Sequence, residues 1–546
     1  MELELQSPNK SNENKVLLIG IFIAIFFASI DETVTDTAVA RIVGDLGGLS
    51  LMPWITSAFM LASLCVMPTV GKLCDRFGRR TVYVSGLFIF MVGSAFCGLS
   101  NDMTQLILFR ALQGFGAGIM VPMALIVIGD MYTAEKRAKM QSMIYALYGV
   151  TAVLGPLVGG WIIVVSSWRW VFYINLPFGL LSILLISLKY KNHKSESKEK
   201  IDLGGIFTLA GGTTSLMLGL TFGGSIYAWI SWQIGSILLL SVVCFGLFIR
   251  IELKTKQPII PLHLFKNKNF LVINGISFML AACIFGALIF VPFYLQGVLD
   301  YSPAASGLIM LAIVWSMTVA GIVGGKWVFH IGVRTQMIIG AVLMGIGFYL
   351  LSILDLNTSI PAMIASLSIT GIGIGLIMPL IMLALYEVFS KDEITTIVSS
   401  SQYFRQIGGT LGATILGALL NMRSSIILKD QLLPHVNQLS EPNQELVNQV
   451  KGMIDNNPQQ LLSPLFNADV ANVFPISMRD EINPVLTSTL SSSLHAVFIG
   501  GLVLACITLA LAFIVGNIRI AKKSEEASIS NAAEDQTNEP NASYSV

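Results

Sequence analysis

Long apolar stretches, separated by short polar segments, dominate this chain. A helix needs about 20 apolar residues to cross the hydrocarbon core of a bilayer, and these stretches reach that length. The pattern predicts fourteen membrane spans, at residues 16–39, 51–72, 80–99, 104–128, 140–165, 170–189, 202–222, 230–250, 270–295, 304–328, 335–354, 360–386, 396–421 and 491–517. We therefore expect an all-α integral membrane protein.

The polar segments divide the spans into groups. We expect a cytosolic N-terminal tail at 1–15, a six-helix bundle at 16–189, two inserted helices with basic inner loops at 190–268, a second six-helix bundle at 269–517 and a disordered cytosolic tail at 518–546. An external loop at 422–490, rich in Asn, Gln and Pro, interrupts the second bundle. Weak helical periodicity at 426–433 and 445–454 predicts a short helical hairpin or a flexible cap there.

Two parts of the chain repeat each other. Gly116-Ala-Gly-Ile-Met-Val-Pro122, late in the fourth span, matches Gly373-Ile-Gly-Leu-Ile-Met-Pro379 in the twelfth, at an offset of 257 residues. A weaker match pairs 71–80 with 325–334. Parallel repeats of this kind predict two related bundles of six helices, with the seventh and eighth spans inserted between them.

Composition and charge placement agree with a multi-pass membrane protein. Hydrophobic residues make up 54% of the chain and charged residues 12%, against roughly 25% charged in a soluble domain. With the N-terminus inside, 25 of the 33 Lys and Arg residues fall on the inner side of the predicted spans. This asymmetry predicts that both termini are cytoplasmic and that the plasma membrane is the location. The net charge of +1 gives no reason to expect a nucleic-acid partner.

The first span carries three acids, Asp31, Glu32 and Asp36. The apolar run before them, 16–28, is too short to cross a bilayer, so the helix must continue through the acids. Each unpaired charge near the bilayer centre costs about 2.5–3.5 kcal/mol. On a helical wheel Glu32 lies about 100° and Asp36 about 140° from Asp31, on one broad face. We interpret them as proton-binding groups; the alternative is that Asp31 and Glu32 cap a short helix at the outer interface.

The fourth span carries Arg110, within Leu108-Phe-Arg-Ala-Leu-Gln113. A guanidinium cannot shed its proton, so inside a membrane it needs an anion or backbone carbonyls. The nearest candidates are the acids of the first span. The alternative is an arginine that extends its side chain to an interface.

The loop between the second and third spans reads Gly71-Lys-Leu-Cys-Asp75-Arg76-Phe-Gly78-Arg79-Arg80. Gly71 and Gly78 permit a tight turn and a close approach of helices. Asp75 can pair with an Arg or with the N-terminus of a helix of the other bundle, and such a contact would hold one transporter state. The alternative is a generic basic inner loop.

The fifth span carries Gly155-Pro156-Leu-Val-Gly159-Gly160. Proline removes a backbone hydrogen bond and kinks a helix, and glycines let a neighbouring helix pack closely. From packing alone this segment predicts a bend.

These motifs resemble those of a known family. The 71–80 loop matches the signature loop of the major facilitator superfamily, and Gly-Pro-x-x-Gly-Gly resembles its antiporter signature, with Thr151 where a glycine is usual. The segment 168–179 and the first-helix segment 30–39 resemble those of the fourteen-span drug:proton antiporters of the QacA and EmrB type. In the first-helix motif Asp36 replaces an Asn and Glu32 is an additional acid.

The resemblance covers about residues 15–520 and implies the major facilitator fold. It implies a proton-coupled multidrug efflux antiporter that exports lipophilic, cationic compounds by alternating access. Asp31, Glu32, Asp36 and Arg110 would then bind protons or the charge of the substrate. The residues expected to serve the conformational change are Gly71, Asp75, Arg76, Gly78, Arg79, Arg80, Gly155, Pro156, Gly159 and Gly160.

No enzymatic activity, metal site or cofactor is expected. The proton gradient is expected to supply the energy. The glycine runs at 114–118 and 371–375 lie inside spans and follow no strand, and no GxxxxGK[ST] motif is present in the sequence. The expected partners are small lipophilic drug-like compounds, protons and membrane lipids, and the expected state is a monomer. Two alternatives stay open: a proton-coupled carrier of one metabolite, and a non-transporting membrane sensor or scaffold.

Overall fold

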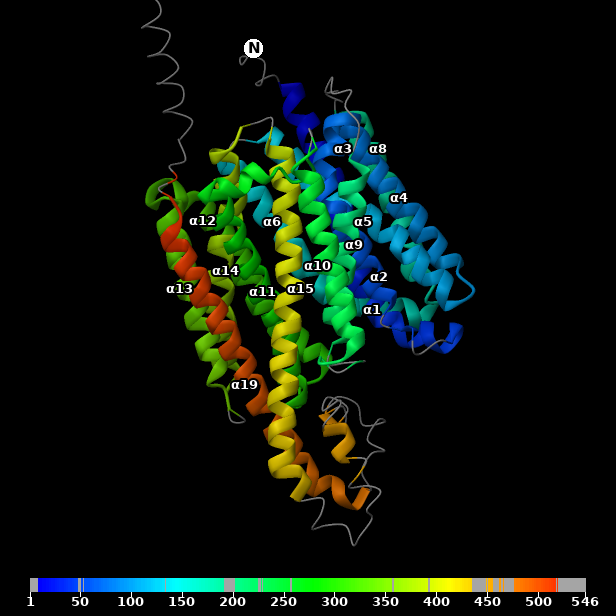
Figure 1. Cartoon of the computed structure of the whole chain (residues 1–546), viewed down its shortest axis with the longest axis vertical. Helices are drawn as coiled ribbons and strands as arrows, with labels where there is room; N and C mark the ends of the chain where they lie inside the picture. Colours follow the sequence, from blue (N-terminus) through cyan, green and yellow to red (C-terminus); the bar gives the residue numbers. More distant parts are fainter. Residues whose placement is uncertain are drawn as a thin grey trace, which may run out of the picture.

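The computed structural model of the chain is built of long helices, most of them running along one direction (Figure 1). It describes residues 8–47, 51–52, 54–132, 134–190, 202–223, 227, 229–255, 258–355, 358–390, 393–434, 448, 450–454, 461–462, 465, 476–516 and 518. The expected tail at 518–546, except residue 518, and most of 435–475 lie outside the described residues.

The helices follow one another with short connections. The first part comprises α1 (Pro8–Leu46), α2 (Trp54–Val66), the 3₁₀ turn η3 (Met67–Thr69), α3 (Val70–Phe77), α4 (Arg79–Leu99), α5 (Met103–Met131), α6 (Ala134–Val165), α7 (Trp170–Tyr173) and α8 (Asn175–Lys189). The second part comprises α9 (Leu203–Phe222), α10 (Trp232–Glu252), η4 (Leu262–Lys266), α11 (Lys268–Gly297), α12 (Pro303–Ile331), α13 (Val333–Ser352), α14 (Ile360–Val388), α15 (Ile394–Ile427), the π-helix η5 (Leu428–Leu432) and α19 (Ile476–Ile514).

The prediction of fourteen spans is confirmed. In the described part of the chain, thirteen helices are long and apolar enough to cross a bilayer. Helix α6 makes a fourteenth, bent by 42° between its segments Lys139–Thr151 and Leu154–Val165. Pro156 explains the bend, because its ring displaces the carbonyl four residues earlier and removes that hydrogen bond.

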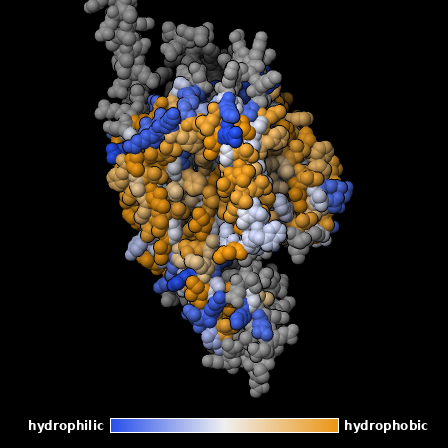
Figure 2. All heavy atoms as spheres, viewed as in Figure 1, coloured by the Kyte–Doolittle hydropathy of each residue, from blue (hydrophilic) through white to orange (hydrophobic). Residues whose placement is uncertain are grey.

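On the face shown in Figure 2, apolar residues form a broad belt, and hydrophilic residues gather towards the two ends of the molecule. Large apolar side chains of the long helices are openly exposed, including Trp161 (66%), Trp232 (78%) and Trp315 (63%). In water such a surface would drive aggregation, whereas in a bilayer it faces lipid. The chain is therefore a multi-pass membrane protein.

Helix contacts form two groups with the same pattern. In the first, α1 packs against α5, α6 and α8, and α5 packs against α2 and α4. In the second, α11 packs against α14, α15 and α19, and α14 packs against α12 and α13. We call these the N-terminal and C-terminal bundles.

The sequence repeat lies at matching places in the two bundles. A Cβ added at Gly116 of α5 would lie 2.4 Å from the backbone nitrogen of Phe90 on α4. A Cβ added at Gly373 of α14 would lie 2.3 Å from the backbone nitrogen of Met344 on α13. Both glycines are thus required for the same close helix crossing.

The two bundles pack together at the end of the molecule where α1 begins and α19 ends, which we call the termini end (Figure 1). The first half of α1 and the second half of α5 share one apolar core with the C-terminal bundle there. At the opposite end a separate core belongs to the N-terminal bundle alone and includes Ile30, Val34, Ile55 and Trp168. The structure is therefore closed at the termini end.

Some element ends differ from the prediction. Residues 8–15, expected as a polar tail, continue helix α1 as far as Pro8, because a helix already formed by the span extends at little further cost. The external loop expected at 422–490 is narrower: α15 and η5 run to Leu432, and α19 begins at Ile476. Buried apolar residues such as Leu432 and Leu486 stabilise these extensions.

Candidate functional site

An ion pair lies fully enclosed in the N-terminal bundle. Nη1 of Arg110, on α5, donates to Oδ2 of Asp31, on α1, over 2.6 Å, and both side chains are 0% exposed. An isolated charge in such a place would carry a desolvation penalty of several kcal/mol, which the opposite charge and surrounding hydrogen bonds offset. The expected contact between Arg110 and an acid of the first span is therefore present.

Two amide side chains hold the other carboxylate oxygen. Asp31 Oδ1 accepts from Nε2 of Gln113 at 2.9 Å and from Nδ2 of Asn175 at 2.5 Å. The same two nitrogens also donate to the hydroxyl of Ser94, at 3.1 and 3.0 Å. Side chains from α5 and α8 thus bind the carboxylate of α1, and Ser94 of α4 accepts from both amides.

The guanidinium of Arg110 has further neighbours. Its Nε donates to the carbonyl of Ile55 at 3.2 Å, and Nη1 also donates to Oε1 of Gln113 at 2.8 Å. The Phe59 ring centroid lies 4.3 Å from its central carbon, a cation–π contact. Among the described residues, Arg110 Nη2 and Asn175 Oδ1 have no hydrogen-bond partner, so the network can accept one further donor and one further acceptor.

Glu32 and Asp36 lie outside this network. Asp36 is exposed and accepts a hydrogen bond of 3.0 Å from Thr56 of α2. Glu32 is half-buried, and within the described part of the chain no hydrogen bond or ion pair to its carboxylate is found. The expectation that the acids share Arg110 therefore applies to Asp31 alone. The rotations of about 100° and 140° along α1 turn the other two carboxylates away from α5.

Both alternative interpretations of these residues are wrong. Asp31 and Glu32 do not cap a short helix, because α1 continues to Leu46. Arg110 does not extend to an interface, because its side chain is 0% exposed.

Glycines of the fifth-span motif bring α6 against α1, the helix that carries Asp31. A Cβ added at Gly155 would lie 2.0 Å from Oγ1 of Thr33, and one at Gly159 would lie 3.1 Å from Cβ of Thr37. Among the described residues, Gly160 has no neighbour within 4 Å of such a Cβ, and Pro156 is exposed. Gly155 and Gly159 therefore serve the close contact with α1, and Gly160 does not.

Thr151, which departs from the family motif, takes part in this same contact. Its hydroxyl lies 2.5 Å from that of Ser29, and its carbonyl accepts from Thr33 Oγ1 at 3.1 Å. A side chain at this position is accommodated because a small polar residue on α1 faces it.

The 71–80 segment, expected as a loop, is mostly helical, because α3 runs to Phe77, and it contacts the C-terminal bundle. A Cβ added at Gly71 would lie 2.7 Å from Cα of Thr396 on α15, so backbone meets backbone there. Gly78 has φ +83°, a conformation that side chains disfavour, and it allows the sharp turn between α3 and α4. Arg79 forms an ion pair with Asp130, and its Nη2 donates to Oγ1 of Thr395 at 3.1 Å.

Asp75 does not make the expected contact with the other bundle. It is half-buried, and among the described residues it has no hydrogen bond to the C-terminal bundle. Arg79 makes that contact instead, while Arg76 is exposed and Arg80 half-buried. The long Arg79 side chain at the start of α4 reaches α15, whereas the short carboxylate of Asp75 makes no such bond in the described part of the chain.

Four polar residues of these contacts were not predicted as site residues: Ser94, Gln113, Asn175 and Thr395. Gln113 lies in the fourth-span segment 108–113 and Asn175 in the segment 168–179, and both are amides inside apolar spans. A buried amide in a membrane requires a polar partner, so these two amides could have been predicted as site residues from the sequence. Ser94 and Thr395 carry no such signal, since hydroxyls in a helix can bond their own backbone.

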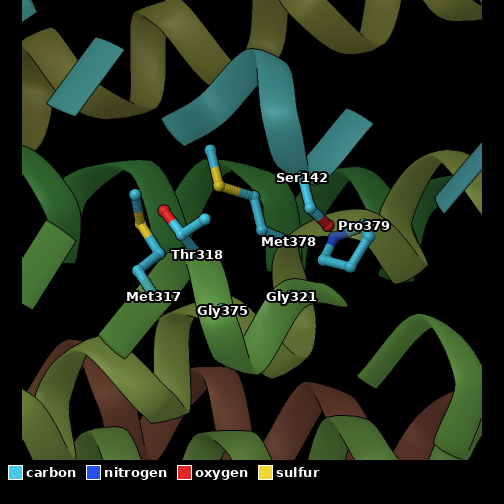
Figure 3. A pocket seen from close by; sticks show the side chains of 7 residues that line it. All are labelled: Ser142, Met317, Thr318, Gly321, Gly375, Met378 and Pro379. Atoms are coloured by element: carbon cyan, nitrogen blue, oxygen red, sulfur yellow. The ribbon is translucent and has the colours of Figure 1, made fainter. Parts of the chain in front are cut away.

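A small cavity lies where α6 meets α12 and α14 (Figure 3). Ser142, Met317, Thr318 and Met378 line it, together with Pro379 and two glycines. Its volume of about 10 Å³ is far below the roughly 300–1,000 Å³ of typical ligand pockets, and no predicted site residue lines it. This cavity is too small to hold a drug-sized compound in the closed state.

A two-bundle helical membrane protein with an ion pair enclosed in one bundle has the construction of a secondary transporter. The model of the Major Facilitator Superfamily matches residues 21–413. The chain belongs to this superfamily.

Relatives and solved structures agree with this assignment. The chain is 45% identical over 524 residues to multidrug transporter protein MdtP of Bacillus subtilis (strain 168), covering 96% of this chain and 97% of that protein. It is 35% identical over 410 residues to multidrug resistance protein 3 of the same strain, covering 75% and 80%. The fold is similar to that of the proton:xylose symporter XylE, with a TM-score of 0.57 at 13% identity, covering 95% of this chain and 99% of that one.

Proposed function

We propose that this protein exports lipophilic, cationic compounds in exchange for protons, by alternating access. The observation that carries the proposal is the enclosed Asp31–Arg110 pair, a titratable group held in the membrane next to a fixed positive charge. Two relatives named as multidrug proteins support the substrate class.

The contacts suggest how a proton could drive the exchange. A proton on Asp31 removes the charge that attracts Arg110, and the guanidinium stays charged. The bond that joins α1 to α5 then weakens, while Gln113 and the carbonyl of Ile55 still hold Arg110. Proton binding is thereby coupled to the packing of α1.

We assign to Glu32 and Asp36 the role of binding the positive charge of the substrate. Both belong to α1, and neither is paired with a cationic side chain among the described residues. A cationic compound close to α1 would find its counter-charge there. Substrate and proton then act on the same helix through different carboxylates.

In this proposal the protein is a monomer in the plasma membrane, surrounded by lipids, and its termini end faces the cytoplasm. The excess of Lys and Arg on that side supports this orientation. The proton gradient is the energy source, with no cofactor. The structure then corresponds to the state closed towards the cytoplasm.

Dye uptake into inverted vesicles with an acidic lumen tests this function. We expect the pH gradient to drive uptake in the wild type, Asp31→Asn to abolish it, and Glu32→Gln and Asp36→Asn to weaken uptake of cationic dyes with less effect on neutral ones. Asp102→Asn is the matched control, because Asp102 is an exposed acid that caps α5 and Asn caps equally well.

The outcome separates this function from the alternatives. Uptake of a single compound out of a broad panel would indicate a metabolite carrier, and no uptake of any compound would indicate a sensor or scaffold. Gradient-driven uptake by Asp31→Asn at the wild-type rate would remove the ion pair from the coupling mechanism.

A further inference from the structure

The inserted helices α9 and α10 belong to neither bundle, yet they lie beside both. Helix α10 packs mainly against α9, and α9 packs against α2 of the N-terminal bundle and α15 of the C-terminal bundle. Figure 1 shows α9 and α10 next to these two helices. A pair that only filled space in the lipid would not need polar contacts to either bundle.

Two adjacent threonines of α9 each contact a different bundle. The hydroxyl of Thr213 lies 2.6 Å from that of Tyr403 on α15, and both side chains are buried. The hydroxyl of Thr214 lies 3.5 Å from the sulfur of Cys65 on α2, which also lies 3.7 Å from the carbonyl of Ala210. Neighbouring residues of a helix point about 100° apart, so one turn of α9 reaches both bundles.

A shared apolar cluster surrounds these polar contacts. Its buried members come from α2, η3, α9, α10, α15 and the segment before α11: Leu64, Met67, Leu209, Met217, Phe248, Ile259, Ile260, Tyr403 and Ile407. The cluster is distinct from the cores of the two bundles. It joins the inserted helices to both bundles at one place.

Glu252, the last residue of α10, binds the backbone of the segment that leads to the C-terminal bundle. It is 3% exposed, and its carboxylate accepts from the backbone nitrogen of Ile259 at 2.9 and 3.1 Å and from that of Ile260 at 3.4 Å. These bonds place Ile259 and Ile260 in the cluster. The connection between α10 and α11 is thereby part of the junction.

The junction lies next to the closed contact between the bundles. Leu64 lies near the end of α2 and Met67 begins η3, which continues into α3. Both η3 and α3 pack against α15. Any opening of the termini end must separate α3 from α15, because the backbones touch at Gly71 and Thr396. Helix α9 cannot then keep both of its contacts.

We propose that α9 is a strut that stabilises the closed termini end, and that the Thr213–Tyr403 hydrogen bond breaks each time this end opens. Helix α9 stays with α2, on which it packs more extensively than on α15. Tyr403 and Thr213 thus set the balance between the two transporter states. This inference rests on the alternating access proposed above.

The first test measures opening of the termini end directly. Thr69, a buried residue of η3, is changed to Cys in a protein whose native cysteines are replaced by Ser, and its alkylation rate is followed in detergent without substrate or pH gradient. Thr213→Val and Tyr403→Phe should each raise the rate about fivefold, the population shift expected from loss of one hydrogen bond. Thr208→Val is the matched control, because within the described part of the chain the Thr208 hydroxyl bonds only its own helix.

The double variant sharpens this test. Both substitutions remove the same bond, so Thr213→Val with Tyr403→Phe should alkylate no faster than either single variant. Unchanged rates in both single variants, or effects that multiply in the double variant, would overturn the proposal. Since no transport is measured, such a result leaves the proposed efflux function intact.

The second test asks which bundle α9 follows. With native Cys65 kept and the other cysteines replaced, Thr214→Cys can form a disulfide to α2. Oxidised protein should transport dye at the rate of the reduced protein, because α9 stays with α2 throughout the cycle. Transport that stops on oxidation and returns on reduction would show that the α2 contact is the one that breaks, contrary to the proposal.

Discussion

Neither Asp31 nor Arg110 could remain charged and alone at the place where the fold puts them. Each is 0% exposed, and each supplies what the other lacks: a counter-charge and hydrogen-bonding capacity. Gln113 and Asn175 complete the arrangement by fixing the second carboxylate oxygen. The carboxylate orientation is therefore determined by residues on two other helices, α5 and α8.

The pair predicts a non-additive effect of mutation on stability. Arg110→Leu should lower the free energy of unfolding by about 3–5 kcal/mol, since it leaves a buried carboxylate without its counter-charge. Adding Asp31→Asn should recover part of that loss, because the remaining group is then neutral. Thermal unfolding in detergent measures both variants.

Arg41→Leu controls for loss of an arginine as such. Arg41 is exposed on α1, so this change should alter stability by no more than about 0.5 kcal/mol. If the double variant loses as much free energy of unfolding as Arg110→Leu and Asp31→Asn lose together, the two charges do not stabilise each other.

At the scale of elements, the contact between α1 and α6 decides how freely the acid-bearing helix can move. Gly155 and Gly159 face α1, and hydroxyls of Ser29, Thr33 and Thr151 bond across the contact. The kink at Pro156 lies in the same turn of α6. Close packing and hydrogen bonds thus hold α1 against the bent part of α6.

Two glycines of one motif should therefore respond differently to the same change. Gly155→Ala places a methyl group 2.5 Å from Cβ of Thr33, so the helices must move apart, at a cost of about 1–3 kcal/mol and with reduced dye transport. Gly160→Ala meets no atom within 4 Å and should transport like the wild type. Equal transport by the two variants, measured at equal expression in vesicles, would show that the close contact is not needed.

At the scale of the whole molecule, the two bundles share a construction and differ in chemistry. The repeat offset of 257 residues aligns Arg110 with Leu367 and Gln113 with Thr370. Leu367 is a fully buried apolar residue of α14. The ionised network thus exists in the N-terminal bundle, and the equivalent place in the other bundle is an apolar core.

The closed termini end depends on close backbone contact, which gives a prediction at this scale. Gly71→Ala would bring a methyl group to within 2.7 Å of the Thr396 Cα and should push α3 away from α15. Spin labels on exposed Arg76 of α3 and exposed Lys266 of η4, one attached to each bundle, should then report a longer mean distance. Gly44→Ala, which meets nothing within 4 Å, should leave the distance distribution unchanged.

The sequence by itself determined the fourteen spans and the grouping of twelve of them into two repeated sets of six. A bilayer offers no hydrogen bonds to the backbone, so an apolar stretch of sufficient length has one available structure, the helix. The same constraint marks Asp31 and Arg110, since a charge in a membrane span requires a partner. Glycines and prolines indicated close crossings and a bend, because their backbone properties are local.

Only the tertiary structure decided which groups meet. A helical wheel put three acids on one broad face, and the position of α5 selected Asp31 from among them. Asn175 reaches the same carboxylate from α8, and Arg79 in place of Asp75 reaches α15. The period of a helix gives the direction of a side chain around its own axis, whereas contacts depend on how helices distant in the chain are rotated and shifted against one another.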